Sequence, residues 1–137
     1  MTVFYPVIFT RTDDKKDTYL IEIPDIGGMS EGYGLADSIN MARDLIGCKL
    51  LEIVDCDIPS ASAIEQINPL NGMFADAGES FVSLIDLDLS AYRRKNESRA
   101  VRKNVSIPAW LDKEAAEANL NLSRILQDAL KEKLNIA

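Results

Sequence analysis

The last third of the chain most constrains how this protein can fold. Residues 101–107 (VRKNVSI) alternate polar and apolar side chains as a β-strand does, and Pro108 then opens two short helical patterns, at about 109–118 and 122–134. Three such elements span fewer than about 40 residues, a length at which a chain rarely buries a core alone. A lone strand also leaves both of its edges unpaired. We therefore expect the strand to pair with the same strand of a second copy.

In the antiparallel two-stranded ribbon that would result, Val105 and Ile107 face the helices. The outward side chains are then those of Arg102, Asn104 and Ser106, because neighbouring residues of a strand point to opposite faces. Such a ribbon fits the major groove of DNA, where Arg can bond twice to guanine and Asn to adenine. The sequence thus predicts a dimer that reads DNA with these three side chains, and an inert exposed strand face is the alternative interpretation.

The two helical patterns supply the rest of this predicted module. Their apolar faces consist of Trp110, Leu111, Ala115 and Ala118 in the first and Leu122, Leu126, Ala129, Leu130 and Leu134 in the second. Asn121 is expected to cap the second helix, and the first amides of that helix, near Leu122 and Ser123, would be free to bind a phosphate. Lys103 and the basic residues before it would either add phosphate contacts or form a solvated linker.

The charge of the chain is divided unevenly. The net charge is −7, but residues 1–90 hold five Lys and Arg against sixteen Asp and Glu, a net −11, whereas residues 91–137 hold ten basic and six acidic residues, a net +4. Such asymmetry indicates two parts with different partners. The acidic part would attract a basic partner, and the basic part would attract nucleic acid.

The first part of the chain predicts an α+β fold with the element order β-β-β-α-β. The expected elements are strands at 2–11, 18–24, 29–33 and 81–92 and a helix at 35–54. The first two strands should form a hairpin, and Pro6 would put the first at a sheet edge or a bulge because proline lacks an N–H. Residues 55–80 are predicted to be loops, and residues 93–100 a polar linker between a domain at 1–92 and one at 101–137.

Several classes of function are disfavoured by composition. The sequence lacks the run of about 18 apolar residues that a membrane span needs, and its start does not resemble a secretory signal, so a cytoplasmic protein is expected. It contains no histidine, the commonest general base. Cys48 and Cys56 are expected to be small buried residues, not a disulfide or a metal site.

Carboxylate chemistry is the remaining catalytic possibility. A metal-dependent nuclease holds two cations between clustered carboxylates. Asp86 and Asp88 lie on one predicted strand, but residues 3–10 of the first strand contain no acid to join them. We therefore expect no enzymatic activity, no metal and no cofactor, and a carboxylate-metal hydrolase stays as an alternative.

Residues 101–134 resemble a ribbon-helix-helix DNA-binding domain. The matching features are the alternating strand that ends in Ile107-Pro108, the amphipathic helix, the Asn-rich turn and the helix that starts at Leu122-Ser123. Asn119 stands where that family often has glycine, and Asn also tolerates a left-handed backbone.

The first part of the chain is similar to the partly degraded ribonuclease H-like domain of HicB-type antitoxins. The similarity rests on the opening hairpin, on Ile23-Pro-Asp25, on Glu31-Gly-Tyr33 and on the helix start at 36–42. It implies an antitoxin whose domain at 1–92 masks a small basic HicA-type toxin that cleaves mRNA. The domain at 101–137 would repress the operon by binding operator DNA as a homodimer or tetramer.

The candidate toxin contacts are Asp25, Glu31 and Asp37, which flank the third predicted strand. For each of these acids, a plain solvated surface position is the alternative interpretation. A further function stays open at this stage, that of a stand-alone repressor whose acidic domain senses a small ligand.

Overall fold

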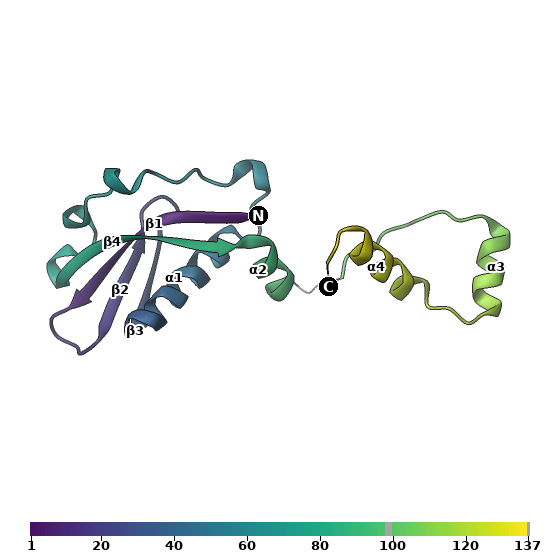
Figure 1. Cartoon of the computed structure of the whole chain (residues 1–137), viewed down its shortest axis with the longest axis horizontal. Coiled ribbons are helices and arrows are strands. Elements are labelled where there is room, and N and C mark those ends of the chain that lie inside the picture. The colour runs from purple at the N-terminus through teal and green to yellow at the C-terminus, as the bar shows by residue number, and fades with distance from the viewer. Residues whose placement is uncertain (98–99, 137) are drawn as a thin grey trace. The chain divides into compact units, whose positions relative to one another are not determined.

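The computed structural model of the protein describes residues 1–97 and 100–136. The chain divides into two compact units, Met1–Arg99 and Ala100–Ala137 (Figure 1). In the described residues, the first unit holds a four-stranded antiparallel sheet and two α-helices, and the second unit holds two further α-helices. The expected α+β class is therefore confirmed.

The sheet contains strands from both ends of the first unit. Its strands are β1 (Thr2–Thr12), β2 (Thr18–Ile23), β3 (Gly28–Tyr33) and β4 (Gly78–Asp88), and helix α1 (Leu35–Leu50) lies between β3 and β4 in the chain. This is the predicted order of elements, and β1 and β2 form the predicted hairpin. The strands lie side by side in the order β3-β2-β1-β4, so β3 and β4 are the two edges.

The core of the first unit lies between the sheet and α1. Val7 and Phe9 of β1 are buried there with Ala42 and Ile46 of α1, whose four-residue spacing puts them on one helix face. Ile8 and Thr10 must point to the opposite face of the sheet, and they are buried as well. Strand β1 is thus covered on both faces, which explains why its sequence is apolar at nearly every position.

The second face of β1 is covered by part of the segment 51–77, of which residues 55–77 were predicted from the sequence to be loops. This segment makes four single turns of 3₁₀ helix, at Asp55–Asp57, Ile64–Gln66, Pro69–Asn71 and Ala75–Ala77. Gly72 lies so close to Ile8 that an added Cβ would be 3.3 Å from the Ile8 Cδ1 atom. The backbone N–H of Met73 donates to the Glu22 carboxylate of β2 at 2.9 Å. The segment is therefore an ordered layer of the fold.

The position of Pro6 differs from the prediction. Strand β1 is flanked by β2 and β4 and is not an edge strand. Pro6 faces Leu84 across the β4 side, while the pairing of β1 with β2 runs from Ile8 onward. The missing N–H therefore falls at a point of β1 that has no β2 partner, and the proline is accommodated without a bulge being required.

Two element ends also differ from the prediction. Helix α1 ends at Leu50 and not at Val54, which already has an extended backbone. Strand β4 ends at Asp88, and helix α2 (Leu89–Asn96) follows where the sequence suggested the end of a strand and the start of a polar linker. The reason is an N-cap, because the Asp88 carboxylate accepts the Ala91 N–H at 3.1 Å.

The second unit contains helix α3 (Ala109–Glu117) and helix α4 (Leu122–Lys133). Asn119 in the turn has φ 58°, the left-handed conformation that the sequence anticipated. Asn121 caps α4 as predicted, since its side-chain oxygen accepts the Arg124 N–H at 3.1 Å. Residues 101–107 form no regular strand in the single chain, which offers this segment no partner strand.

Candidate functional surfaces

Asp25 anchors the 51–77 segment to the turn between β2 and β3. Its Oδ1 atom accepts the Ser62 hydroxyl at 2.6 Å, and its Oδ2 atom accepts the Ser62 N–H at 2.8 Å. Both carboxylate oxygens are thus engaged inside the fold. The half-buried Asp25 side chain has a structural role that the sequence did not reveal, and its part in binding a toxin stays a prediction.

Asp37 and Glu31, the other predicted toxin contacts, lie at the β3 edge of the sheet. Asp37 is in the first turn of α1, and its Oδ2 atom accepts the Tyr33 N–H at 2.9 Å, at the end of β3. Glu31 lies opposite Leu20 of β2. Met29 and Tyr33 stand two residues to either side of Glu31 and are exposed. The β3 edge therefore combines acidic and apolar side chains, and sequence reasoning missed the two apolar ones.

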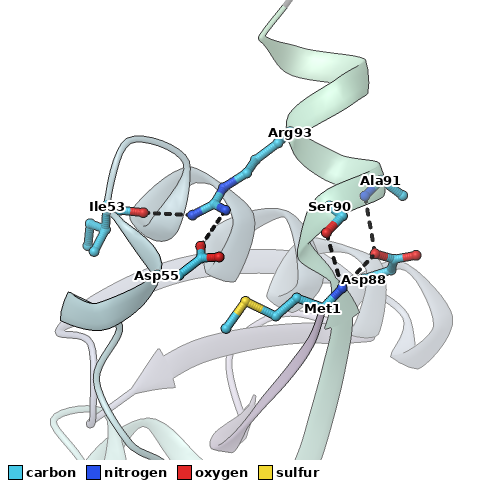
Figure 2. Close-up of polar contacts among 7 residues, drawn as sticks. All are labelled: Met1, Ile53, Asp55, Asp88, Ser90, Ala91 and Arg93. Carbon is cyan, nitrogen blue, oxygen red and sulfur yellow. Dashed lines mark hydrogen bonds and ion pairs between the residues drawn. The ribbon is translucent and has the colours of Figure 1, made fainter. Parts of the chain in front are cut away.

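Helix α2 is held to the rest of the first unit at both of its ends (Figure 2). At its start, the N-terminal amino group of Met1 donates to Ser90 Oγ at 3.1 Å and lies 4.0 Å from the Asp88 carboxylate. In its last turn, Arg93 donates to the Asp55 carboxylate at 2.7 Å and to the Ile53 carbonyl at 2.6 Å. The basic residues 93–95 thus lie in a helix that packs on the rest of the first unit.

An open hollow of the first unit lies beside Arg93. Residues 51–56 line it together with Arg93 and Glu97. The Arg93 guanidinium, the cation that could hold an anionic ligand there, already bonds Asp55 and Ile53. This arrangement gives the ligand-sensing alternative no specific support.

The two cysteines are exposed, which contradicts the expectation that they are buried. Cys48 lies on the outer side of α1, where its Sγ atom is 3.2 Å from the Tyr92 hydroxyl of α2. Tyr92 also donates to Asp44 Oδ1 at 3.0 Å. Burial, followed by the hydrogen bonds to Cys48 and Asp44, raises the pKa of the Tyr92 hydroxyl. The Tyr92 hydroxyl therefore links α2 to α1.

Asp86 and Asp88, the β4 carboxylates that a hydrolase would use, are engaged in other contacts. Arg43 of α1 donates to Asp86 Oδ1 at 3.3 Å, and Asp88 caps α2. Over residues 1–97 and 100–136, no three His, Cys, Asp or Glu side chains gather as metal ligands would. The arrangement therefore offers the hydrolase alternative no support.

The second unit leaves most of its apolar side chains exposed. Ala115 is its one buried apolar residue among those described. Trp110 is 63% exposed, although tryptophan is normally largely buried. The other large apolar residues exposed in this unit are Val101, Val105, Ile107, Leu111, Leu120, Leu122, Ile125, Leu126, Leu130 and Leu134. With Trp110, they include every large side chain of the two helix faces that the sequence predicted, so a single chain leaves these faces uncovered.

The predicted DNA-binding residues all lie at the surface of this unit. Arg102, Lys103, Asn104 and Ser106 are exposed in the segment before α3. Leu122 and Ser123 begin α4, ahead of the Arg124 N–H that Asn121 caps. The first N–H to bond within α4 is that of Ile125, which donates to the Asn121 carbonyl at 3.0 Å. That these residues meet on one face of a dimer stays a prediction.

Comparison with protein families places the sequence among bacterial antitoxins. The family model described as "HicB_like antitoxin of bacterial toxin-antitoxin system" matches residues 5–129. The chain therefore belongs to the HicB-like antitoxin family of bacterial toxin–antitoxin systems. No curated protein matches the sequence at a significant level.

Solved structures of the same kind resemble this chain. A toxin–antitoxin complex from Streptococcus pneumoniae contains a chain with 27% identity and a TM-score of 0.59, and the match covers 97% of this chain and 99% of that one. The antitoxin HicB of Burkholderia pseudomallei has 26% identity and a TM-score of 0.48, with 97% of each chain covered. Every helix in the described part of this chain is too short or too polar to cross a membrane.

Proposed function

We propose that this antitoxin neutralises a HicA-type toxin that cleaves mRNA, and that it represses its own operon by binding operator DNA. The acidic unit, a degraded ribonuclease H-like domain, binds the toxin. The module at 101–137 dimerises as a ribbon-helix-helix domain and binds the DNA. Family membership supports the antitoxin role, and the opposite net charges of residues 1–90 and 91–137 support the division of labour.

The exposed apolar surface of the second unit carries this proposal. Each square ångström of apolar surface removed from water stabilises an assembly by roughly 25 cal/mol. Burying a surface that includes Trp110, Leu126 and Leu130 would therefore favour association strongly. A second copy would cover it by pairing the two 101–107 segments and packing the helices of both copies together. Dimerisation would then give this segment the partner strand that one chain lacks.

The DNA contacts follow from the ribbon. Arg102, Asn104 and Ser106 would point away from the helices and read base edges in the major groove. Lys103 would contact phosphate, as would the N–H groups of Leu122 and Ser123, because the start of a helix carries partial positive charge and unpaired donors. The role is regulatory and not enzymatic, and it requires no cofactor.

Gel-shift titration tests the DNA-binding half of the proposal. Full-length protein should bind the DNA upstream of its own gene more tightly than unrelated DNA, with an affinity that falls steeply with salt. The double variant R102A/N104A should lose this selectivity while light scattering still gives the mass of a dimer. The double variant Q127A/K131A, which also removes one cation and one amide, is the matched control and should keep the selectivity for this DNA. Unchanged selectivity in R102A/N104A would exclude the proposed reading face.

Co-purification tests the toxin-binding half. The protein should elute as a complex with the product of a short basic reading frame next to its gene, and it should stop that product from degrading mRNA. The absence of such a neighbouring frame would instead favour the stand-alone repressor.

A further inference from the structure

Strand β4 leaves one edge of the sheet open. It pairs with β1 along its full length, from Gly78 to Asp88, and no strand of the described residues lies on its other side. It is also nearly twice as long as β3, the opposite edge, which has six residues. In Figure 1, β4 is the long green strand that leads into α2. A long open edge is a template for pairing with another chain.

Two contacts establish which residues of β4 direct their backbone groups outward. Pro6 lies opposite Leu84 and has no N–H to donate, so this pair fits the position where the two strands exchange no hydrogen bonds. Two residues further on, the carbonyl of Asp86 accepts the Arg43 Nε–H at 3.2 Å. Alternate residues share a direction, so Ser80, Val82 and Leu84 also point their N–H and C=O groups outward.

These outward groups are unsatisfied by the described chain. No strand, loop or side chain of the described residues bonds the backbone of Ser80, Val82 or Leu84 from outside the sheet. Natural edge strands are usually protected by proline, by lysine, by a bulge or by a covering element. Strand β4 contains neither proline nor lysine, and the Arg43 side chain covers only its far end.

The side chains next to this edge are apolar and acidic. Leu84 is 48% exposed and Phe4 of β1 is 53% exposed. They are diagonal neighbours on one face of the sheet, because Phe4 lies opposite Asp86. Residues 50–92 contain eight Asp and Glu and no Lys or Arg. A second copy would bring the same acidic charge to the edge, whereas a basic chain would be attracted to it.

We propose that the outer edge of β4 is where this antitoxin binds its partner, by accepting an extended basic strand of that protein into the sheet. The partner strand pairs with the backbone of Ser80, Val82 and Leu84 and covers Leu84 and Phe4 with an apolar side chain. Arg43 ends the pairing at Asp86. Main-chain hydrogen bonds supply the affinity in this mode of recognition. The inference rests on the proposed binding of a basic toxin by the first unit. It places that site at the β4 edge, in place of the β3 edge where the sequence predicted contacts at Glu31 and Asp37, so a substitution at each edge decides between the two.

The test compares one substitution at each edge of the sheet in the full-length protein. L84K places a cation at the β4 edge, and M29K places the same charge at a residue of similar exposure, 57%, on the β3 edge. The probe is the basic protein encoded beside this gene, measured by calorimetry after circular dichroism has shown that both variants are folded. L84K should weaken binding by about tenfold or more, and M29K by less than about threefold.

Hydrogen exchange of the wild-type complex provides a second readout. The amides of Val82 and Leu84 should become protected when the basic protein binds, because they then donate to its strand. Equal losses from L84K and M29K, or unprotected Val82 and Leu84 amides in a complex that does form, would overturn the β4 site and leave toxin binding intact. If the wild-type protein forms no complex with the basic protein at all, the proposed toxin binding is wrong, and the β4 site that rests on it is wrong too.

Discussion

Gly32 of β3 lies directly against Ser38 of α1. A Cβ atom added at Gly32 would be 2.6 Å from the Ser38 Cα atom and would also collide with the Ser38 Oγ atom. Ser38 is fully buried, and its hydroxyl donates to the Gly34 carbonyl at 2.7 Å. Glycine at position 32 therefore sets how closely the first turn of α1 packs on the β3 edge.

Replacing Gly32 by alanine should destabilise the first unit. The new methyl group meets the helix backbone, which cannot rotate away as a side chain can, and overpacking of this kind costs about 1–3 kcal/mol. Urea unfolding followed by circular dichroism measures the change. The control is G72A, whose nearest neighbour is the end of the Glu22 side chain at 3.0 Å. G72A should cost less, and equal losses would argue against the proposed collision.

The sequence predicted what depends on local pattern. Alternation and helical spacing identified the four strands of the sheet and α1, and the Asn residues at 119 and 121 indicated the turn and the cap before α4. The same alternation predicted a strand at 101–107, which does not form in the single chain. What the sequence could not reveal depends on pairing between distant residues. Pro6 is tolerated because the pairing of β1 with β2 starts only at Ile8. Asp25 anchors the 51–77 segment because the fold brings Ser62, 37 residues later in the chain, within hydrogen-bond distance of it. No pattern within a short window encodes either relationship.

Asp25 should matter for stability more than an exposed acid does. D25A removes both acceptors of the Ser62 bonds, and hydrogen bonds to a charged group contribute about 1.5–3 kcal/mol, net of the bonds to water that they replace. Unfolding by urea should show a loss of about 2 kcal/mol. In a double-mutant cycle, D25A and S62A should be coupled, because they share the 2.6 Å hydroxyl bond. Purely additive losses would mean that this bond contributes nothing.

Two tyrosines should make the first unit sensitive to high pH. Burial raises the pKa of the Tyr5 hydroxyl, helped by the nearby Asp25 carboxylate, and burial with hydrogen bonding raises the pKa of Tyr92. The folded chain then holds these protons when the unfolded chain has begun to lose them. The contribution to stability is full below the ordinary tyrosine pKa of 10.0 and is lost as the pH rises above it.

Urea unfolding on both sides of pH 10.0 tests this expectation. The free energy of unfolding of the wild type should fall with rising pH, and Y92F should show a shallower fall, because phenylalanine has no proton to lose. Y33F, at an exposed position of β3, is the control. A slope in Y92F that equals that of the wild type would remove Tyr92 as a cause.

Arg93 should determine how firmly α2 is docked. R93A loses the Asp55 ion pair and the bond to the Ile53 carbonyl, and the amides of α2 should then exchange faster with solvent. The loss of stability should be modest, about 1 kcal/mol, because Asp55 is exposed and its ion pair is screened. R93K should recover only part of the protection, since lysine lacks the planar group that makes both bonds. R94A, at the exposed neighbouring position, should leave exchange unchanged.

Lys103 should contribute affinity for DNA without contributing selectivity. A lysine that contacts phosphate releases a counterion on binding, whichever base sequence lies beneath it. K103A should therefore weaken binding to operator and unrelated DNA by the same factor, and the slope of log K against log salt should fall by about 1. R102A should instead reduce binding to the operator more than binding to unrelated DNA, because Arg102 reads a base. K113A, on α3, is the control of equal charge. If K103A changed the preference for the operator while the salt slope stayed constant, Lys103 would be a base-reading residue and the assignment of the outward face of the ribbon would have to be reversed.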